Sequence, residues 1–249
     1  MTAFTFSHSP FPIRDDLTAA YRDFWSQLAH AGTWWTGDER VAIAAELRQA
    51  TGCAYCAERK NALSPYSLPG EHTSVENSPL DVNAIDAVHR VVTDQTRITR
   101  TWIQENAANG LPEGQYVELV GVVVCVLSID EFCRALGLPL EPLPAAVEGE
   151  PSKYVPSGLE SETAMVSMIG AGQGGPDEND LWPEGRTANV IRALSQVPNA
   201  VREWLAIGDV QYLPMAKIRD PSSDTDRVLN RMQIEIVAGR VSSHNECFY

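Results

Sequence analysis

The segment from Glu113 to Leu136 constrains the fold more than any other part of the chain, because it is long and rich in apolar side chains. The β-branched residues between Val117 and Val126 would also suit a buried strand. We prefer a helix, because the segment is longer than a usual strand and the sequence shows no partner strand. The chain is therefore predicted to be built from helices.

Earlier segments have the same helical pattern. Apolar residues recur at helical spacing from Tyr21 to His30, and Val82 to Asn109 is expected to form one further helix. Between them, Thr36 and Glu39 fit a capping box, in which each side chain accepts a hydrogen bond from a backbone amide at the helix start. The sequence Asn-Gly-Leu-Pro at 109–112 marks a break between helices.

Composition divides the chain into three regions: residues 1–138, 139–186 and 187–249. The first is the helical region described above. The 47 residues from Pro139 to Gly185 include 7 Pro and 7 Gly, which predicts a linker or an irregular cover for the middle region.

The third region is expected to contain two helices. They run from Val190 to Ile207 and from Asp224 to Ser243. Ser222, Ser223 and Asp224 are candidate N-caps of the second helix, because their side-chain oxygens can accept hydrogen bonds from backbone amides.

Charge and cysteine content restrict the class of protein. The formal net charge is −14, which argues against binding to nucleic acid or to an anionic membrane surface. The longest apolar run, Leu119 to Leu127, is too short to span a bilayer. Five cysteines are an odd and low number, and no signal peptide is visible, so we expect a soluble protein of the reducing cytoplasm.

The sequence Cys53-Ala-Tyr-Cys56 is the strongest candidate for chemistry. If a helix begins just after Gly52, both thiols lie in its first turn, where free backbone amides and the helix dipole stabilise a thiolate. Arg59 and Lys60 follow Cys56 by three and four residues and would add to this effect. A close cysteine pair of this kind favours redox chemistry: one thiolate attacks a peroxide oxygen or a disulfide sulfur, and the other forms the intramolecular disulfide.

Other interpretations of the cysteines remain open. Cys53 and Cys56 could be inert buried residues, as we expect for Cys125 and Cys133. A zinc site would need two further ligands; the candidates His72 and His89 do not have the spacing of a common zinc finger, and Arg59 and Lys60 would repel the cation. We therefore expect no metal and no cofactor, a loop position for His72 and a structural role for His89.

The cysteine motif resembles that of the alkylhydroperoxidase D and carboxymuconolactone decarboxylase superfamily, which has the pattern Glu…Cys-x-x-Cys-x-x-x-His at a junction of two helices. The first copy reads Cys53 to Lys60, and a second reads Glu235…Cys247-Phe-Tyr249. A weak internal repeat supports two copies, because residues 40–53 and 234–247 both pair an amphipathic helix with a following cysteine. The resemblance implies an all-α fold of two such helical units joined by a Pro/Gly-rich linker, peroxidase activity in some members, and oligomerisation.

The sequence departs from the family pattern at several positions. Lys60 replaces the histidine, and it is a poor proton shuttle at neutral pH. The relay glutamate falls on Val41, so Glu46, two turns before Cys53, is the candidate replacement, whereas Glu39 suits a helix cap. In the second copy Glu235 and Cys247 match the pattern, but the chain ends one residue before the second cysteine, and we expect the natural sequence to continue.

These observations predict a dithiol-dependent hydroperoxide reductase or a related antioxidant thiol oxidoreductase. Cys56 is expected to attack and Cys53 to resolve, with Lys60, Glu46, Glu235 and Cys247 as further site residues. Expected partners are a small peroxide or disulfide substrate and a thiol reductant, either a protein or a small dithiol. The rivals are a carboxymuconolactone decarboxylase-like lyase, whose chemistry needs no cysteine pair, and a non-catalytic helical scaffold with a decayed site.

Overall fold

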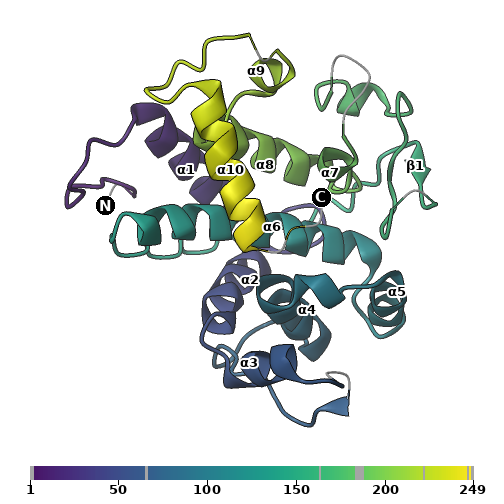
Figure 1. The fold of residues 1–249 in the computed structure, drawn as a ribbon. Helices are drawn as coiled ribbons and strands as arrows, with labels where there is room; N and C mark the ends of the chain where they lie inside the picture. Colours follow the sequence, from purple (N-terminus) through teal and green to yellow (C-terminus); the bar gives the residue numbers. More distant parts are fainter. Residues whose placement is uncertain are drawn as a thin grey trace. The chain divides into compact units, whose positions relative to one another are not determined.

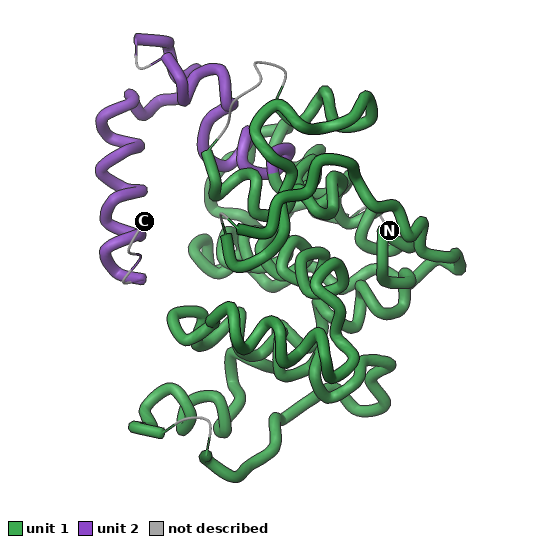
Figure 2. The backbone as a smooth tube through the Cα atoms, turned by 90° about the vertical axis from the view of Figure 1, so that its right-hand side faces the viewer, with its two compact units in different colours: residues 1–204 green, residues 205–249 purple. Residues whose placement is uncertain are grey.

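A computed structural model describes residues 3–64, 67–162, 164–182, 188–220, 222–245 and 247. The chain forms two compact units, residues 1–204 and 205–249 (Figure 2). This division differs from the boundaries near residues 138 and 186 that composition suggested. The prediction of two equivalent family units joined by a linker therefore stays a prediction.

The described residues are mostly helical, as expected (Figure 1). The helices are α1 (Asp15–Leu28), α2 (Gly37–Ala50), α3 (Ala54–Asn61), α4 (Val82–Thr93), the 3-10 helix η2 (Gln95–Arg97), α5 (Arg100–Ala108), α6 (Glu113–Ala135), η3 (Pro176–Glu178), α7 (Asn189–Arg192), α8 (Pro198–Gln211), α9 (Met215–Arg219) and α10 (Arg231–His244). Among these residues, no helix is both long enough and apolar enough to cross a membrane.

The long apolar segment is a helix rather than a strand, and it forms the centre of the first unit. α6 packs against α2 and α4, and α3 packs against α4 (Figure 1). Leu119, Val126 and Ile129 of α6 are fully or almost fully buried. Burying a side chain of this size stabilises the fold by about 1.5–3 kcal/mol, so α6 contributes strongly to holding α2 and α4 in place.

The start of α2 confirms the predicted capping box. The Thr36 hydroxyl accepts a hydrogen bond from the Glu39 N–H, and the Glu39 carboxylate accepts one from the Thr36 N–H at 2.8 Å. Glu39 is therefore a helix cap, as the sequence indicated. The same helix places Glu46 two turns further on, fully buried and facing α4.

The prediction of one helix from Val82 to Asn109 was wrong. α4 ends at Thr93, and a new helix, α5, begins after Thr99, whose hydroxyl accepts a hydrogen bond from the Trp102 N–H. Asp94, at the end of α4, has a non-helical backbone with φ of −149°. The helix stops here because the Thr99 side chain caps a new helix, α5, and this competes with continuing α4.

The two helices predicted for the third region also differ from the structure. The segment Val190 to Ile207 contains a break, because α8 begins anew at Pro198. α10 begins at Arg231 rather than at Asp224, and its N-cap is Asn230, which forms a capping box with Gln233. Asn230 is the cap instead of the predicted residues. Its side chain accepts a hydrogen bond from the Gln233 N–H, and the Gln233 side chain accepts one from the Asn230 N–H.

The middle region is largely irregular but contributes to the core of the first unit. Two short strands, β1 (Leu159–Glu160) and β2 (Met168–Ile169), pair antiparallel, with Leu159 opposite Ile169. Met168 and Ile169 are fully buried. This segment therefore packs as part of the first unit.

A candidate site of two thiols and two imidazoles

The cysteine pair lies at the start of a helix, as predicted. Cys53 is the N-cap residue of α3, and Cys56 lies in its first turn. Neither thiol forms a disulfide in the structure, and both are buried, with 3% and 1% of their surface exposed. Backbone N–H groups at a helix start have no partner within the helix, so those of the first turn of α3 can donate hydrogen bonds to the Cys53 sulfur.

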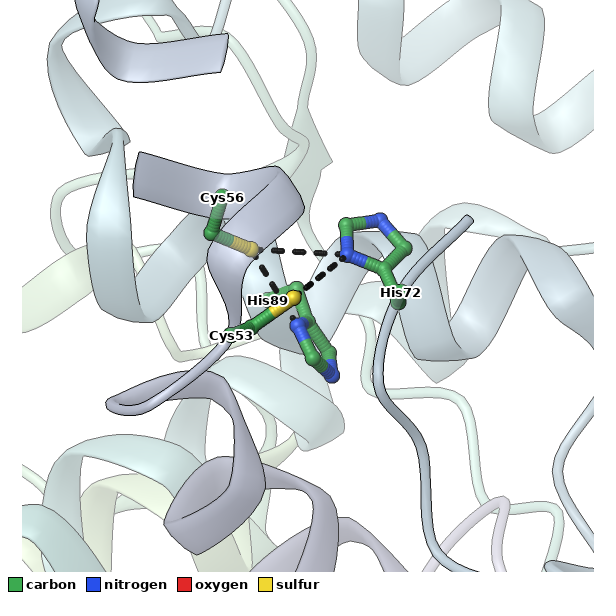
Figure 3. A group of neighbouring side chains, drawn as sticks. All are labelled: Cys53, Cys56, His72 and His89. Atoms are coloured by element: carbon green, nitrogen blue, oxygen red, sulfur yellow. Dashed lines mark hydrogen bonds between the residues drawn. The ribbon is translucent and has the colours of Figure 1, made fainter. Parts of the chain in front are cut away.

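Two histidines face the cysteines from other parts of the first unit (Figure 3). The Nδ1 atom of His72 lies 3.8 Å from the Cys53 sulfur and 3.4 Å from the Cys56 sulfur. The Nδ1 atom of His89 lies 3.2 Å from the Cys56 sulfur. One ligand atom from each of the four side chains lies within 4.8 Å of the others.

His72 is carried by the segment between α3 and α4, whose described residues, 62–64 and 67–81, are here called the covering loop. Its Nε2 atom lies 3.0 Å from the Asp86 carboxylate of α4, which also pairs with Arg59 of α3. The Thr73 N–H, next in the loop, donates to the Cys53 sulfur at 3.4 Å. The loop is therefore anchored to both the thiol and the following helix.

A close contact between Tyr55 and a glycine fixes the course of the covering loop. The Tyr55 hydroxyl donates to the carbonyl of Leu68 at 3.1 Å, and its ring lies edge-on to His72 with centroids 5.0 Å apart. A Cβ atom added at Gly70 would lie only 2.4 Å from the Tyr55 ring. Glycine is needed here because any other side chain would push the loop away from α3.

His89 belongs to α4 and is fully buried. Its Nε2 atom lies 3.4 Å from the Glu46 carboxylate of α2, whose other oxygen accepts a hydrogen bond from the Val75 N–H at 2.8 Å. A carboxylate beside Nε2 favours the tautomer that carries its proton there. In this tautomer Nδ1 is free to accept a proton from the Cys56 thiol.

The local electrostatics favour ionisation of Cys53. Burial opposes the thiolate, but hydrogen bonds from the backbone N–H groups of Cys56 and Thr73, together with His72, outweigh burial and lower the pKa of Cys53 to about 6. Cys125 and Cys133 show the contrast, because burial raises the pKa of each of these thiols. Both residues are buried in the core, as the sequence indicated.

The two imidazoles have opposite protonation preferences. Burial opposes the charge of His72, but Asp86 and the two cysteines raise its pKa to about 10. Burial and the nearby positive charges of His72 and Arg59 lower the pKa of His89 to about 4. Metal-free and reduced, the site therefore holds a positively charged His72 beside a Cys53 thiolate, and a neutral His89 beside Cys56.

Other residues chosen from the sequence take different positions. Lys60 is exposed on α3, whereas Arg59 is buried and pairs with Asp86, so Arg59 is the cation built into the site. Glu46 reaches the dithiol only through His89. It therefore acts on the imidazole and not directly on a sulfur.

The residues of the predicted second copy belong to the second unit. Glu235 pairs with Arg231 at 2.6 Å and accepts a hydrogen bond from the Tyr212 hydroxyl at 2.6 Å. Cys247 is exposed and lies beyond the C-terminal end of α10, where its backbone N–H donates to the Ser242 carbonyl. With a rise of about 1.5 Å per residue, α10 holds Glu235 and its own C-terminus more than ~10 Å apart.

Sequence reasoning missed that His72, His89 and Asp86 belong to the site. His72 does lie in a loop, and His89 does lie in a helix, but both face the thiols. A signal was present in α4: Asp86, His89 and Arg90 are spaced three and four apart, which puts three polar residues on one face of a helix that buries Ala84, Ala87 and Val88. Polar residues on a buried face need partners.

Comparisons with known proteins found no matching family model, no matching curated protein and no matching solved structure. The resemblance to alkylhydroperoxidase D thus rests on the residues of the motif alone.

Proposed function

We propose that the protein is a dithiol-dependent reductase of hydroperoxides that works through Cys53 and Cys56. The observation that carries this proposal is the continuous chain from the Glu46 carboxylate to His89, from His89 to the Cys56 sulfur, and on to Cys53. It supplies a resolving thiol, a base for its proton and an orienting carboxylate beside the Cys53 nucleophile, which are the parts needed to complete a dithiol reaction. His89 fills the role that the sequence resemblance assigned to position 60.

In the first step, the Cys53 thiolate attacks one peroxide oxygen and the O–O bond breaks. A sulfenic acid forms on Cys53, and the alkoxide that leaves takes a proton from the His72 imidazolium to become an alcohol. We assign attack to Cys53 rather than to Cys56, in contrast to the sequence interpretation, because His72 and two backbone amides stabilise the Cys53 thiolate. The thiolate is the reactive form of the thiol.

In the second step, Cys56 resolves the sulfenic acid. His72 has given up its proton in the first step, so its charge no longer lowers the pKa of His89. The Cys56 thiol proton then passes to His89 Nδ1, the Cys56 sulfur attacks the Cys53 sulfur, and the S–O bond breaks. The departing hydroxide takes the proton from His89 and becomes water. The sum is one hydroperoxide and two thiol equivalents converted to an alcohol, water and a disulfide; an external dithiol, small or protein-borne, then returns two electrons and two protons.

Burial of both sulfurs sets a condition for this chemistry. The covering loop closes over the thiols through His72 and Thr73, whose contacts with them are at 3.4–3.8 Å. We infer that a hydroperoxide enters by displacing His72 and Thr73 from the sulfurs. Small hydroperoxides should react faster than bulky ones for this reason.

The test compares consumption of tert-butyl hydroperoxide by the metal-free, full-length protein with dithiothreitol as reductant. Cys53→Ser should abolish consumption above the rate of dithiothreitol alone. Without dithiothreitol, Cys56→Ser should consume one equivalent of hydroperoxide and end in a Cys53 sulfenic acid that dimedone traps. Cys133→Ala, which removes a buried thiol of α6 outside the site, is the matched control and should keep activity.

Equal consumption by the wild type and Cys53→Ser would contradict the proposal. A lyase of the decarboxylase type would keep its activity in both cysteine variants, because its chemistry does not need the thiol pair. A non-catalytic scaffold would show no consumption above the rate of dithiothreitol alone.

A further inference from the structure

We propose that Cys53, Cys56, His72 and His89 together bind one zinc ion while the two thiols are reduced, and that oxidation of the thiols to a disulfide releases it. Zinc binding stands on the geometry of the four side chains alone. Its release by hydroperoxide rests on the proposed function. The zinc-bound form would be the closed, protected state of the same site.

The donor atoms are arranged as they would be around a tetrahedral ion. With Zn–S near 2.3 Å and Zn–N near 2.0–2.1 Å, sulfur and nitrogen ligands on one tetrahedron lie about 3.6 Å apart. Three of the four sulfur–nitrogen distances in the site are 3.8, 3.4 and 3.2 Å. All four donors lie within 4.8 Å of one another, so a small contraction completes the shell. Two thiolates and two imidazoles in tetrahedral array are the donor set typical of zinc.

The second set of contacts around the histidines supports the same conclusion. Both rings turn Nδ1 toward the sulfurs, and both place Nε2 beside a carboxylate, that of Asp86 for His72 and that of Glu46 for His89. Histidine ligands of zinc characteristically donate their second ring N–H to a carboxylate, which orients the ring and strengthens the metal bond. The four side chains come from three segments, namely the start of α3, the covering loop and α4, and they point toward one another (Figure 3).

The close approach of the two imidazoles is also explained by a metal. Their ring centroids lie 4.2 Å apart, so two charged rings would repel each other strongly. A zinc ion takes both rings in their neutral form and neutralises both thiolates. Burial of the sulfurs, which hinders a peroxide, suits a structural zinc site with four protein ligands and no open position.

The basic residues that argued against zinc in the sequence do not oppose it in the structure. The Arg59 guanidinium pairs with Asp86 and is thereby neutralised, and Lys60 is exposed on α3. The acidic groups Asp86 and Glu46 balance the local charge. The site as a whole therefore tolerates a divalent cation.

Conversion of the zinc-bound dithiolate to the zinc-free disulfide is balanced in atoms and electrons. Zinc binding displaces two protons, one from the Cys56 thiol and one from the His72 imidazolium. One hydroperoxide and two protons then convert the zinc dithiolate to a disulfide, an alcohol, water and free Zn²⁺, in which the sulfurs lose two electrons and the O–O bond gains them. A disulfide leaves only two imidazole donors, which are too few to hold the ion.

The direct test is a cobalt(II) titration of metal-free, reduced, full-length protein without oxygen. We expect saturation at one cobalt per chain, with the intense visible bands of tetrahedral cobalt and a charge-transfer band from thiolate. Zinc should then displace the cobalt and remove the bands. A weak spectrum typical of octahedral cobalt, or no saturation, would overturn the inference.

Variants identify the ligands. His72→Ala, in the covering loop, and His89→Ala, in α4, should each weaken cobalt affinity by at least about tenfold. His30→Ala is the matched control: His30 is exposed and its ring contacts the Ser26 carbonyl, so its loss should not change the titration. Circular dichroism checks that each variant is folded, and unchanged affinity in both folded ligand variants would reject the site.

A final measurement separates the two proposals. Hydrogen peroxide is added to the zinc-loaded protein in the presence of a colorimetric zinc indicator, and release should parallel formation of the Cys53–Cys56 disulfide by mass spectrometry. Tetrahedral cobalt binding without peroxide turnover by the metal-free protein would reject the proposed function and keep the zinc site. Peroxide turnover without cobalt binding would reject the zinc site and keep the proposed function.

Discussion

At the level of single residues, the two cysteine sulfurs differ in the charged and polar groups that surround them. The charged imidazole of His72 lies near both sulfurs, but Cys53 also accepts backbone hydrogen bonds at a helix start, whereas Cys56 also faces the neutral imidazole of His89. The two thiols of one short motif therefore have different environments. Their order of reaction follows from this difference.

Alkylation of Cys53 tests its acidity. In metal-free, reduced Cys56→Ser protein, the rate of reaction with iodoacetamide should rise with pH and level off above about 6, because the lowered pKa of Cys53 makes the thiolate dominant there. Mass spectrometry of the Cys53 peptide measures the rate. Lys60→Ala should leave the midpoint unchanged, since Lys60 is exposed; a midpoint near the ordinary thiol value of about 8.5 would contradict the assignment.

Glu46→Gln tests the carboxylate behind His89. Glutamine is close in size but cannot fix the Nε2–H tautomer as firmly, so we expect hydroperoxide turnover and cobalt affinity to fall by about 10–100-fold. Turnover and cobalt titration measure the two effects. Glu71→Gln, at an exposed residue of the covering loop next to His72, is the control; equal values for the two variants would remove Glu46 from the site.

At the scale of elements, the covering loop is the part that completes the site. It supplies His72 and the Thr73 N–H, and it is held by Tyr55, Glu46 and Asp86 from three helices. Of the four donor side chains, Cys53 and Cys56 come from the start of α3 and His89 from α4. Loop closure is thus what joins the second imidazole to the dithiol.

Gly70→Ala tests how tightly the loop must close. The added methyl group would meet the Tyr55 ring, so we expect destabilisation by about 1–3 kcal/mol and weaker cobalt binding. Gly52→Ala is the control, because a Cβ there meets no atom closer than 4.0 Å. Urea unfolding and the cobalt titration give the two readouts, and full cobalt affinity in a folded Gly70→Ala protein would show that closure does not depend on this contact.

At the scale of the molecule, a buried ion pair joins distant parts of the first unit. Arg40 of α2 binds the Glu203 carboxylate of α8 at 2.9 Å, with Glu118 of α6 at 3.9 Å. All three side chains are almost fully buried. This network ties the helix that carries Glu46 to the rest of the unit.

Arg40→Met should destabilise the protein by about 3–5 kcal/mol, because it leaves Glu203 and Glu118 buried without their cation. Arg14→Met, which removes an exposed pair with Asp16, should cost only about 0–1 kcal/mol. Urea unfolding measures both. Equal losses would mean that the buried network contributes no more than a surface pair.

Zinc should stabilise the reduced protein only. Free zinc at 100 times its dissociation constant adds about 2.7 kcal/mol to a folded state that binds one ion. Thermal unfolding with and without zinc therefore should differ under reducing conditions and coincide after oxidation to the disulfide. A shift of equal size in both redox states would point to binding elsewhere.

The amino-acid sequence is sufficient to predict the structural features that depend on residues close together in the chain. The capping box at Thr36 and Glu39, the helical character of α6 and the position of Cys53 and Cys56 at a helix start all depend on residues a few positions apart. Local hydrogen bonding and side-chain periodicity are sufficient to specify such features.

Only the tertiary structure decided which groups surround the thiols. His72 and His89 are separated from their cysteine partners by 19 and 33 residues, and Glu46 reaches His89 across 43. These contacts exist because α2, α4 and the covering loop pack together, so they cannot be predicted from the spacing of the residues in the sequence. The breaks at Asp94 and Pro198 were missed for a related reason: where a new cap competes with a continuing helix, packing determines which one forms.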